Sequence, residues 1–452
     1  MIKNPKPQSP RAPLRLALAG LGTVGAGVIR LVETNAELIA RRAGRPVVIT
    51  AISARNRDKD RGIDLSAYVW EDDMTAMAAR DDVDVVVELV GGSDGPALTL
   101  ARNAITHGKA LITANKAMIA HHGVELAGAA ETKGVALRFE AAVAGGIPVI
   151  KGLREGAAAN RIERIYGILN GTCNYILSTM EDTGADFAEV LGQAQAKGYA
   201  EADPTFDIEG IDAAHKLSIL SGIAFGAAID FASVDTAGIS RILAADIAEA
   251  QALGYVIRLI GMAESDLELG QPRLFQRVQP HLVHSDNLLA HVDGATNAVV
   301  VEGNFSGRLL FQGAGAGDGP TASAVVADII DIARGMDTGF EADMTFSVPV
   351  TELVAMAPAA SGHRIGRAYI RFLVADRPGV LAEITAAMRD AGVSIESFIQ
   401  RGRPGQDEAD DEVLVAMVTH EGPEAAVNEA LRLLEGSASL TAPPLVMRII
   451  EA

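Results

Sequence analysis

The sequence predicts an α/β protein, and three observations carry that prediction. The chain has 452 residues, of which 49% are hydrophobic, which is enough for about three domains with sizeable cores. Near its start, a short apolar run is followed by a glycine-rich turn and a helical pattern, the order found in doubly wound parallel sheets. Near its end, strand and helix patterns follow one another as βαββαβ, the ferredoxin-like arrangement.

Composition narrows the range of partners and compartments. The net charge of −19 disfavours nucleic acids and anionic membrane surfaces as partners. The single cysteine excludes an internal disulfide and a cysteine-ligated zinc site. Residues 1–13 are polar and proline-rich and lack the apolar core of a signal peptide, so we expect a disordered tail and a cytoplasmic protein. No apolar run reaches the ~18 residues of a membrane span.

The first domain begins with a pattern typical of dinucleotide binding. Residues 14–19 are an apolar strand candidate, and a helical pattern starts a few residues later. The turn between them has the G-x-G-x-x-G spacing at Gly20, Gly22 and Gly25. Glycines at these positions permit a tight turn and the close approach of a pyrophosphate to a helix N-terminus. A glycine-rich turn without a ligand is the alternative.

The second strand candidate, residues 46–52, indicates which dinucleotide is bound. A site that prefers NAD places Asp or Glu near the end of this strand, to bind the ribose 2′-hydroxyl. Here no acidic residue follows the strand directly, and Arg55 and Arg57 stand there instead. Because an arginine can pair with a 2′-phosphate, NADP is favoured, while NAD remains possible. The alternative is a basic surface loop.

Lys116 follows another predicted strand. Residues 84–90 and 109–113 are apolar strand candidates, and Lys116 comes just past the carboxyl end of the second one. Doubly wound sheets bind ligands at that edge. Lys116 therefore either bridges cofactor and substrate or is a solvent-exposed lysine that begins a helix.

Two further glycine-rich turns are candidates for binding sites. Glu140 ends the strand candidate 137–140, and the turn at 141–148 can hold a hard monovalent cation through its backbone carbonyls or be an ordinary strand-to-helix turn. The turn at 313–321 precedes a helical pattern and includes Gly317, which we expect to approach the nicotinamide end of the cofactor. A plain glycine-rich turn is the alternative there as well.

Residues 199–216 hold a dense group of charges. They include five carboxylates and end on Lys216. A helix is predicted from Gly210, and on it Asp212 and Lys216 share one face because they are four residues apart. Acidic groups beside a lysine suit a small cationic substrate and a proton donor. The alternative is an exposed ion pair at an acidic helix start.

The C-terminal part reads as a linker followed by a small module. Residues 341–366 carry prolines and little periodicity. The module that follows has strand candidates at 368–375, 393–400, 413–419 and 445–450, with helix candidates at 379–390 and 423–434. The loop at 376–381 enters the first of these helices, and its amides can receive an amino-acid carboxylate.

With these motifs in place, the chain resembles homoserine dehydrogenase of the monofunctional bacterial type with a C-terminal ACT domain. The motifs that carry the resemblance, in the family's order, are GLGTVG, TANKAMIA, EAAVAGGIPVI, GILNGTCNYIL, KGYAEADPTFDIEGIDAAHKL and GAGAGDGPTASAVVADI. The similarity runs from about Leu14 to the C-terminus, and the 13 residues before it carry no aspartate kinase pattern, so we expect the monofunctional type. Asp318 stands where the family pattern has glycine, and we expect a small local change there.

The resemblance implies a reaction and the residues that perform it. The reaction is the reversible, NAD(P)-dependent reduction of L-aspartate 4-semialdehyde to L-homoserine, on the route to threonine and methionine. The cofactor would contact the first glycine-rich turn, including Thr23 and Val24, and also Lys116. The substrate would contact Gly198, Glu201 and Asp212, with Lys216 as general acid. A sodium ion would be held by Glu140 and by the backbones of Val143, Gly145 and Ile147.

The resemblance also implies the domain organisation. We expect a Rossmann domain over residues 14–136 that is completed by 311–340, a catalytic and dimerisation domain over 137–310, and an ACT domain over 367–452. The ACT domain implies threonine as an effector, and the second domain implies a homodimer or homotetramer.

Two other functions are weighed against this one. An aspartate-semialdehyde dehydrogenase would use Cys173 as a nucleophile, but no histidine lies near it in sequence, and a small residue packed at a helix start fits better. A non-enzymatic sensor of NADP and an amino acid fits poorly, because the acidic cluster and both lysines are present.

Overall fold

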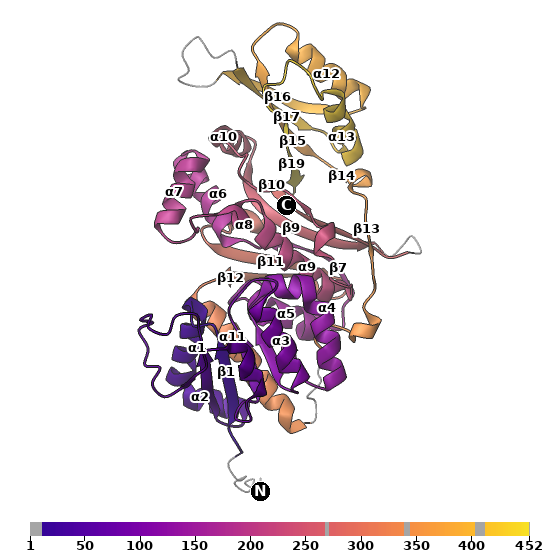
Figure 1. Ribbon diagram of the computed structural model, residues 1–452. Coiled ribbons are helices and arrows are strands. Elements are labelled where there is room, and N and C mark those ends of the chain that lie inside the picture. The colour runs from indigo at the N-terminus through magenta and orange to yellow at the C-terminus, as the bar shows by residue number, and fades with distance from the viewer. Residues whose placement is uncertain (1–10, 267–270, 339–343, 403–411, 452) are drawn as a thin grey trace, which may run out of the picture.

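The computed structural model describes residues 11–266, 271–338, 344–402 and 412–451. Figure 1 shows three stacked parts: the nucleotide-binding domain, a broad central sheet with its helices, and the C-terminal module. Most of the predicted tail, residues 1–10, lies outside the described residues. Within the described ranges, no helix combines the length and the apolar character that crossing a membrane requires.

The first domain is built on a six-stranded parallel sheet with the strand order β3-β2-β1-β4-β5-β6. The strands are β1 (Leu14–Ala19), β2 (Val47–Ser53), β3 (Val69–Trp70), β4 (Val85–Glu88), β5 (Ala110–Thr113) and β6 (Leu137–Arg138). The helices are α1 (Thr23–Thr34), α2 (Ala36–Ala43), α3 (Pro96–Thr106) and α4 (Lys116–Lys133). The order reverses between β1 and β4, and such sheets bind ligands beside the carboxyl ends of the strands at that point.

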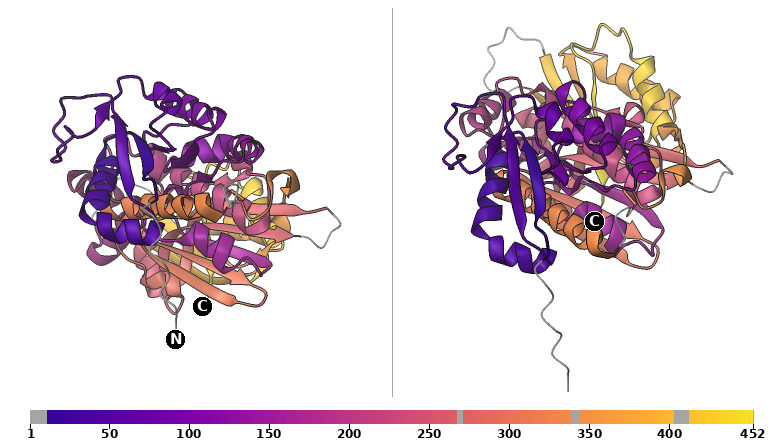
Figure 2. Two further views of the ribbon diagram at one scale, coloured as in Figure 1. Left: turned by 90° about the horizontal axis from the view of Figure 1, so that it is seen from below. Right: turned by 60° about the horizontal axis from the view of Figure 1, so that its bottom comes forward.

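Helix α11 (Asp318–Thr338) returns to this domain after the second domain is complete. It packs beside α1, as both views in Figure 2 show. Ala322, Val325 and Ile329 recur at helical spacing, and they join the same buried core as residues of β1 and α1. The chain therefore crosses from the second domain to the first at the glycine-rich turn that precedes α11.

The second domain is an antiparallel sheet with the order β12-β11-β7-β9-β10. Its strands are β7 (Ile162–Ile168), β9 (Tyr255–Asp266), β10 (Arg273–His284), β11 (Thr296–Gly303) and β12 (Gly307–Ala314), with β8 (Asp235–Thr236) beside β10. Its helices are α5 (Val149–Lys151), α6 (Gly171–Thr183), α7 (Phe187–Ala196), α8 (Thr205–Ile208), α9 (Ile211–Phe225) and α10 (Ala244–Ala252). Helix α9 packs on β7, β9 and β10, and this packing holds its first turn over the sheet.

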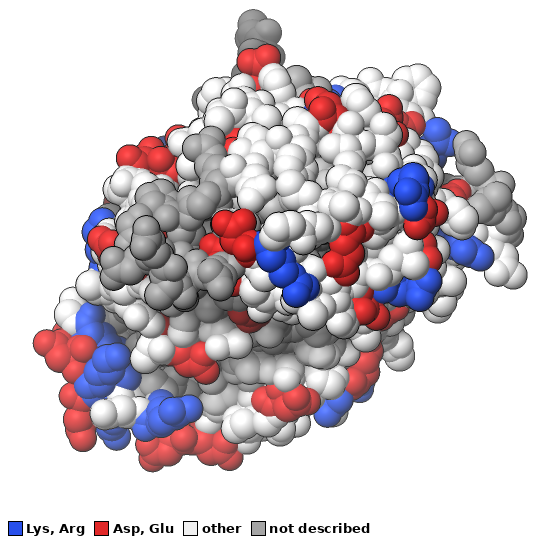
Figure 3. Space-filling model, turned by 90° about the horizontal axis from the view of Figure 1, so that it is seen from above, with Lys and Arg blue, Asp and Glu red and all other residues white. Residues whose placement is uncertain are grey.

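The C-terminal module has the predicted βαββαβ order and the ferredoxin-like arrangement. Its elements are β15 (Ala368–Ala375), α12 (Val380–Asp390), β16 (Ile395–Gly402), β17 (Glu412–Thr419), α13 (Glu424–Leu433) and β19 (Leu445–Ile450). Strand β19 also pairs in parallel with β10, with Leu282 opposite Ile449. The module and the second domain therefore share one 11-stranded sheet. On the face seen in Figure 3, basic side chains are scattered among acidic ones.

Two segments differ from the sequence-based expectation. The strand expected at 137–140 ends at Arg138, because the Glu140 carboxylate accepts hydrogen bonds from the amides of Ile150 and Lys151 and the chain turns to reach them. The predicted linker at 341–366 lies partly outside the described residues. Its described part contains β13 (Ala357–Pro358), which pairs with β10, and β14 (Ile365–Gly366), which pairs with β18 (Gly422–Pro423).

Candidate active site

A cavity of about 250 Å³ lies between the first two domains, beside the carboxyl ends of the parallel strands. Val24 of the first glycine-rich turn and Lys116, at the start of α4, line one side. Lys216 of α9 and Gly315 of the second glycine-rich turn line the other. Ala144 and Gly145 of the predicted cation loop line it as well, so the fold brings together five segments that lie far apart in the sequence.

The first glycine-rich turn has the geometry that a pyrophosphate site requires. Gly20 has φ +99°, which only glycine adopts readily, and a Cβ on Gly25 would lie 2.0 Å from the carbonyl oxygen of Gly20. Gly22 faces open space, because a Cβ there would meet no atom within 4 Å. No side chain caps the start of α1. The amides of the first helical turn can therefore face an anion.

Three arginines gather beyond the end of β2, where the ribose of a dinucleotide would lie. Arg55 is exposed two residues after the strand, and the Arg57 guanidinium lies 5.6 Å from the centre of the Trp70 ring. Arg61, which was not predicted as a site residue, donates a hydrogen bond of 3.0 Å to the carbonyl oxygen of Leu21. This contact ties the loop to the glycine-rich turn. The local pattern carries no signal for Arg61, because the contact spans forty positions.

Two lysines share one buried carboxylate at the floor of the cavity. The Lys216 Nζ lies 2.7 Å from Asp212 Oδ2, and the Lys116 Nζ lies 2.6 Å from Asp212 Oδ1. Lys216 also donates to the carbonyl oxygen of Leu169 at 2.8 Å. The side chain of Asp212 is 2% exposed, so this is no solvent-exposed ion pair at a helix start. The geometry argues against that alternative for Lys216, whose side chain is 9% exposed, whereas the Lys116 side chain, at 34%, begins α4 and still reaches the buried carboxylate.

The charges of this cluster move the pKa values of the two lysines in opposite directions. Burial lowers the pKa of Lys216 against the opposing charge of Asp212, and the nearby Lys116 lowers it further. Burial also lowers the pKa of Lys116, but the charge of Asp212 outweighs it, and Asp207 and Glu201 add smaller effects in the same direction as Asp212. The pKa of Lys116 is therefore raised. Although burial acts the other way, the two ammonium groups hold the pKa of Asp212 far below its usual range. Lys216 is therefore the better proton donor and Lys116 the more persistent cation.

Asn170 and Asp207 belong to the same cluster, although neither was among the site residues selected from the sequence. The side-chain amide of Asn170 donates to Asp207 Oδ1 and to Asp212 Oδ2, both at 2.8 Å. Its carbonyl oxygen accepts from the amide of Cys173 and so caps the start of α6. Burial, followed by the charge of Asp212, raises the pKa of Asp207. An asparagine before a helix is a recognisable cap signal in a sequence. The contacts of the Asn170 side chain with Asp207 and Asp212, however, depend on the tertiary fold.

The predicted substrate residues Gly198 and Glu201 lie on the turn between α7 and α8. Both are exposed, and Gly198 has φ +77°. The charge of Glu201 contributes to the raised pKa of Lys116, so this turn faces the same cluster. Asp212, by contrast, is occupied by its two lysines and Asn170. The geometry thus favours Asp212 as a residue that positions the lysines.

Cys173 is buried and unsuited to act as a nucleophile. Its Sγ lies 3.1 Å from the carbonyl oxygen of Asp207, and burial raises the pKa of the thiol well above its usual value. A thiol in such surroundings stays protonated and inert. The aspartate-semialdehyde dehydrogenase alternative, which needs a reactive Cys173, is therefore not supported.

We expect Cys173→Ser to retain catalysis, with kcat within about threefold of the unmodified protein, because the hydroxyl replaces a thiol that only packs and donates one hydrogen bond. Steady-state rates with homoserine check this. If kcat instead falls by several orders of magnitude while circular dichroism shows an intact fold, the alternative in which Cys173 is the nucleophile is supported.

The loop predicted to hold a cation is buried beside the cavity. Gly145 has φ +48°, and a Cβ there would lie 2.5 Å from the carbonyl oxygen of Gly315, so the loop packs on the second glycine-rich turn. The Glu140 carboxylate is used by two backbone amides, and the Ile147 carbonyl accepts from Val149. Among the described residues, no hydrogen-bond donor reaches the carbonyl oxygens of Val143 and Gly145. These two oxygens therefore fit a hard cation.

The second glycine-rich turn shows where Asp318 points. Gly317 has φ +120° and turns the chain into α11. The Asp318 carboxylate pairs with Arg30 of α1 and packs against Gly27, where a Cβ would lie 2.0 Å from Asp318 Oδ1. Asp318 is not among the residues that line the cavity. The departure from the glycine pattern therefore links α11 to α1.

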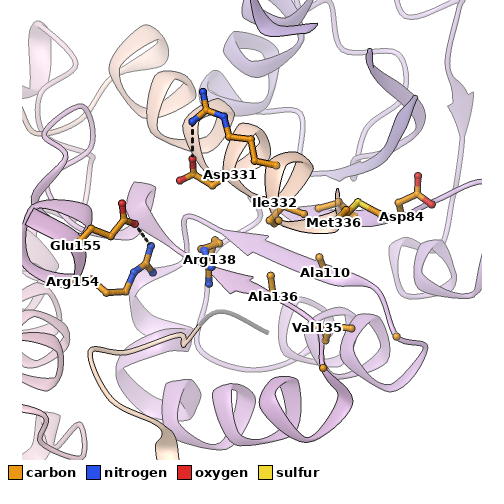
Figure 4. Close-up of a pocket in the computed structure, with 15 residues that line it drawn as sticks. Asp84, Ala110, Val135, Ala136, Arg138, Arg154, Glu155, Asp331, Ile332 and Met336 are labelled. Carbon is orange, nitrogen blue, oxygen red and sulfur yellow. Dashed lines mark hydrogen bonds and ion pairs between the residues drawn. The ribbon is translucent and has the colours of Figure 1, made fainter. Parts of the chain in front are cut away.

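Figure 4 shows another cavity, of about 350 Å³, at the opposite edge of the parallel sheet. Asp84, Ala110 and Ala136 lie at the amino ends of β4, β5 and β6, and Asp331 and Met336 come from α11. Doubly wound sheets bind ligands at their carboxyl ends. None of the predicted site residues lines this cavity, so the active site is placed in the cavity that holds the two lysines.

Comparisons with known proteins agree with this geometry. The homoserine dehydrogenase family profile matches residues 148–330, the profile "Homoserine dehydrogenase, NAD binding domain" matches 20–140, and the ACT domain profile matches 368–435. A homoserine dehydrogenase of Pseudomonas aeruginosa is 44% identical, over 97% of this chain and 99% of its own length.

Solved structures give the same result. The crystal structure of a homoserine dehydrogenase from Thiobacillus denitrificans has a TM-score of 0.88 at 42% identity, covering 97% of this chain and 99% of that one. A hyperthermophilic archaeal homoserine dehydrogenase in complex with NADPH has a TM-score of 0.59 at 25% identity, covering 71% of this chain and 97% of that one. The chain therefore belongs to the homoserine dehydrogenase family of oxidoreductases, with a nucleotide-binding domain, a catalytic domain and a C-terminal ACT domain.

Proposed function

We propose that the protein interconverts L-homoserine and L-aspartate 4-semialdehyde with a nicotinamide dinucleotide, and that the cluster of Lys116, Asp212 and Lys216 performs the proton chemistry. The observation that carries the proposal is the pair of lysines on one buried carboxylate, in a cavity lined by both glycine-rich turns. Family membership supplies the substrate class.

The chemistry follows from the charges of the cluster. The bound dinucleotide supplies the hydride for reduction and accepts it in oxidation. Reduction of an aldehyde leaves an alkoxide, which needs a proton and a nearby positive charge. Lys216, with its lowered pKa, donates the proton from Nζ, while Lys116 stays cationic and stabilises the developing charge. Asp212 holds both ammonium groups in place.

The ammonium group of the substrate needs carboxylates that the lysines do not already neutralise. Glu201 lies on the exposed turn that faces the cluster, and Asp207 bonds to Asn170 beside Asp212. Both remain available to a cationic group. We therefore assign substrate recognition to Gly198, Glu201 and Asp207, and lysine positioning to Asp212.

The direct test is oxidation of homoserine by the purified protein, followed by the absorbance of the reduced nicotinamide with NADP and with NAD. Turnover with at least one cofactor, and none when L-serine replaces homoserine, is the expected result. If neither cofactor is reduced while both bind, the proposed function is wrong and the sensor alternative returns.

We further propose that NADP is the preferred cofactor and that Arg55 and Arg57 bind its 2′-phosphate. Replacing both with Ala should raise KM for NADP by about tenfold or more, since hydrogen bonds to charged groups are worth roughly 1.5–3 kcal/mol, and should barely change KM for NAD. Arg41→Ala removes an exposed arginine of α2 as a control. Equal effects on both cofactors would show that Arg55 and Arg57 are only surface residues.

A monovalent cation, sodium by preference, is proposed at the carbonyl oxygens of Val143 and Gly145, with Glu140 and Ile147 beside them. Burial, followed by the charge of Asp328, raises the pKa of Glu140 to about 7. A bound cation favours the charged carboxylate, so sodium should raise the midpoint of thermal unfolding more at about pH 8 than at about pH 6. Tetramethylammonium at equal ionic strength is the control, and an equal response to both cations would exclude the site.

Assembly, compartment and regulation complete the proposal. Phe305, in the turn before the edge strand β12, is 90% exposed, and Leu310 of β12 is 39% exposed, which fits burial in a homodimer or homotetramer. Sedimentation velocity checks this assembly, and a monomer at micromolar concentration contradicts it.

We propose a cytoplasmic enzyme of threonine and methionine biosynthesis that threonine inhibits through the ACT domain.

A further inference from the structure

A cavity of about 400 Å³ lies where the ACT domain meets the second domain. We call it the joint cavity. It lies beside the junction of β10 and β19, and one wall is the ion pair between Arg277 of β10 and Glu424 of α13, at 2.8 Å. Its volume falls in the range of small-molecule sites. It is separate from the cavity that holds the two lysines, since no residue lines both.

The charges of the joint cavity are balanced and of both signs. The cationic residues that line it are Arg241, Arg277 and Arg448, and the anionic ones are Glu209, Asp235 and Glu424. Arg277 already pairs with both Glu424 and Asp235, so the set of charges left to a ligand is Arg241, Arg448 and Glu209. A small zwitterion, with one carboxylate and one ammonium group, matches it.

Two of the arginines are incompletely paired. The Arg448 Nη2 donates a long hydrogen bond of 3.4 Å to Asn428 Oδ1 and lies 3.6 Å from Glu424, whose carboxylate is already bidentate to Arg277. Arg241 donates to two backbone carbonyls, of Pro443 and Pro444, rather than to a carboxylate. Burial lowers the pKa of both Arg241 and Arg448. Both guanidinium groups therefore retain capacity to bind a carboxylate.

The joint cavity also touches the segment that leads into the catalytic helix. Glu209 lines it and lies between Asp207, which contacts Asn170 and Cys173, and Gly210, which directly precedes α9. Gly238 lines it as well and packs so closely on this segment that a Cβ would lie 2.2 Å from the carbonyl oxygen of Ile208. A ligand that draws Glu209 toward the cavity would therefore shift Asp207 and the first turn of α9.

We propose that the joint cavity is a regulatory site for a free amino acid. Arg241 and Arg448 bind its carboxylate, and Glu209 binds its ammonium group. Binding inhibits because the ligand favours the arrangement in which Asp207 is displaced. The proposal rests on the proposed function and names the place of its regulation.

This site differs from the loop at 376–381 that the sequence suggested. That loop follows the end of β15, and β15 pairs with β19 only over its first residues, Ala368 to Arg371. The loop therefore lies at the end of the module that is remote from β10. The joint cavity, by contrast, is in direct contact with both domains.

The test uses the full chain and L-threonine as the probe. Inhibition of homoserine oxidation and calorimetric binding are measured for the unmodified protein, for Arg241→Gln, and for Asn428→Trp, which places a bulky side chain at the exposed edge of the cavity. Both variants should raise the half-inhibitory concentration by about tenfold or more, with threonine-free kcat and KM within about twofold. Arg389→Gln, which replaces an exposed arginine of α12 outside the cavity, is the matched control, and Asp376→Asn probes the loop.

Each outcome decides the proposal. If threonine neither binds nor inhibits the unmodified protein, the regulatory site is excluded, while the threonine-free rate still reports separately on the proposed function. If Asp376→Asn abolishes inhibition and the two cavity variants behave like the control, the effector binds the loop instead. If Arg241→Gln does not fold, the response of Asn428→Trp to threonine decides whether the joint cavity is the site. That variant removes no charge, so the ion pairs of the cavity stay in place.

Discussion

Lys216→Ala is expected to lower kcat by about 10²–10⁴-fold, the range for a lost acid–base group, with little change in the affinity for the dinucleotide. The reason is the position of its Nζ, buried between Asp212 Oδ2 and the carbonyl oxygen of Leu169 at the floor of the cavity. Steady-state kinetics in both directions, with direct titration of the cofactor, measure the two effects separately.

The pH profile distinguishes a proton donor from a structural lysine. Oxidation of homoserine needs Lys216 neutral, so the rate should rise with pH through its lowered pKa, and this rise should vanish in Lys216→Ala. Lys133→Ala, which removes an exposed lysine at the end of α4, serves as a control and should leave rate and profile unchanged. A kcat for Lys216→Ala close to that of the control would refute the assignment.

The largest effect on stability is expected for Asp246→Ala. Asp246 is fully buried in α10 and accepts hydrogen bonds from Arg371 at 2.6 Å and from the Tyr369 hydroxyl at 2.9 Å, both on β15 of the ACT domain. Removing it leaves the Arg371 guanidinium buried and unpaired, which costs roughly 3–5 kcal/mol. The urea midpoint of the transition that separates the two domains should fall accordingly.

Asp286→Ala gives the comparison for Asp246→Ala. The Asp286 side chain is 81% exposed, and exposed substitutions usually change stability by less than about 0.5 kcal/mol. If the two variants unfold at the same urea concentration, the Asp246–Arg371 pair does not hold the domains together. The same pair argues against shortening the chain at the linker, since that would leave the buried Asp246 without Arg371.

Local patterns were sufficient for the elements and for half of the active site. Apolar runs of strand length, followed by glycines or helical periodicity, predicted the parallel sheet and the βαββαβ module. The i, i+4 spacing predicted that Asp212 and Lys216 would meet, and they do, at 2.7 Å. These predictions succeed because backbone periodicity places such residues on one face whatever surrounds them.

The tertiary structure decided which distant residues complete that site. Lys116 reaches Asp212 because α4 begins at the carboxyl end of β5 and faces the first turn of α9 across the cavity. Asn170 joins them from the start of α6. Such contacts depend on how helices pack on sheets, so no spacing along the sequence encodes them.

The relation between the domains was likewise decided only by the fold. The sequence by itself determined a nucleotide-binding domain, a catalytic domain and an ACT domain in that order. Pairing of β19 with β10 makes the ACT sheet continuous with the catalytic sheet and creates the joint cavity between them. The apolar pattern of β10 indicates that it lies in a sheet with neighbours on its edges. Which strand becomes its neighbour depends on the shape and burial of the whole molecule, and here that strand is β19.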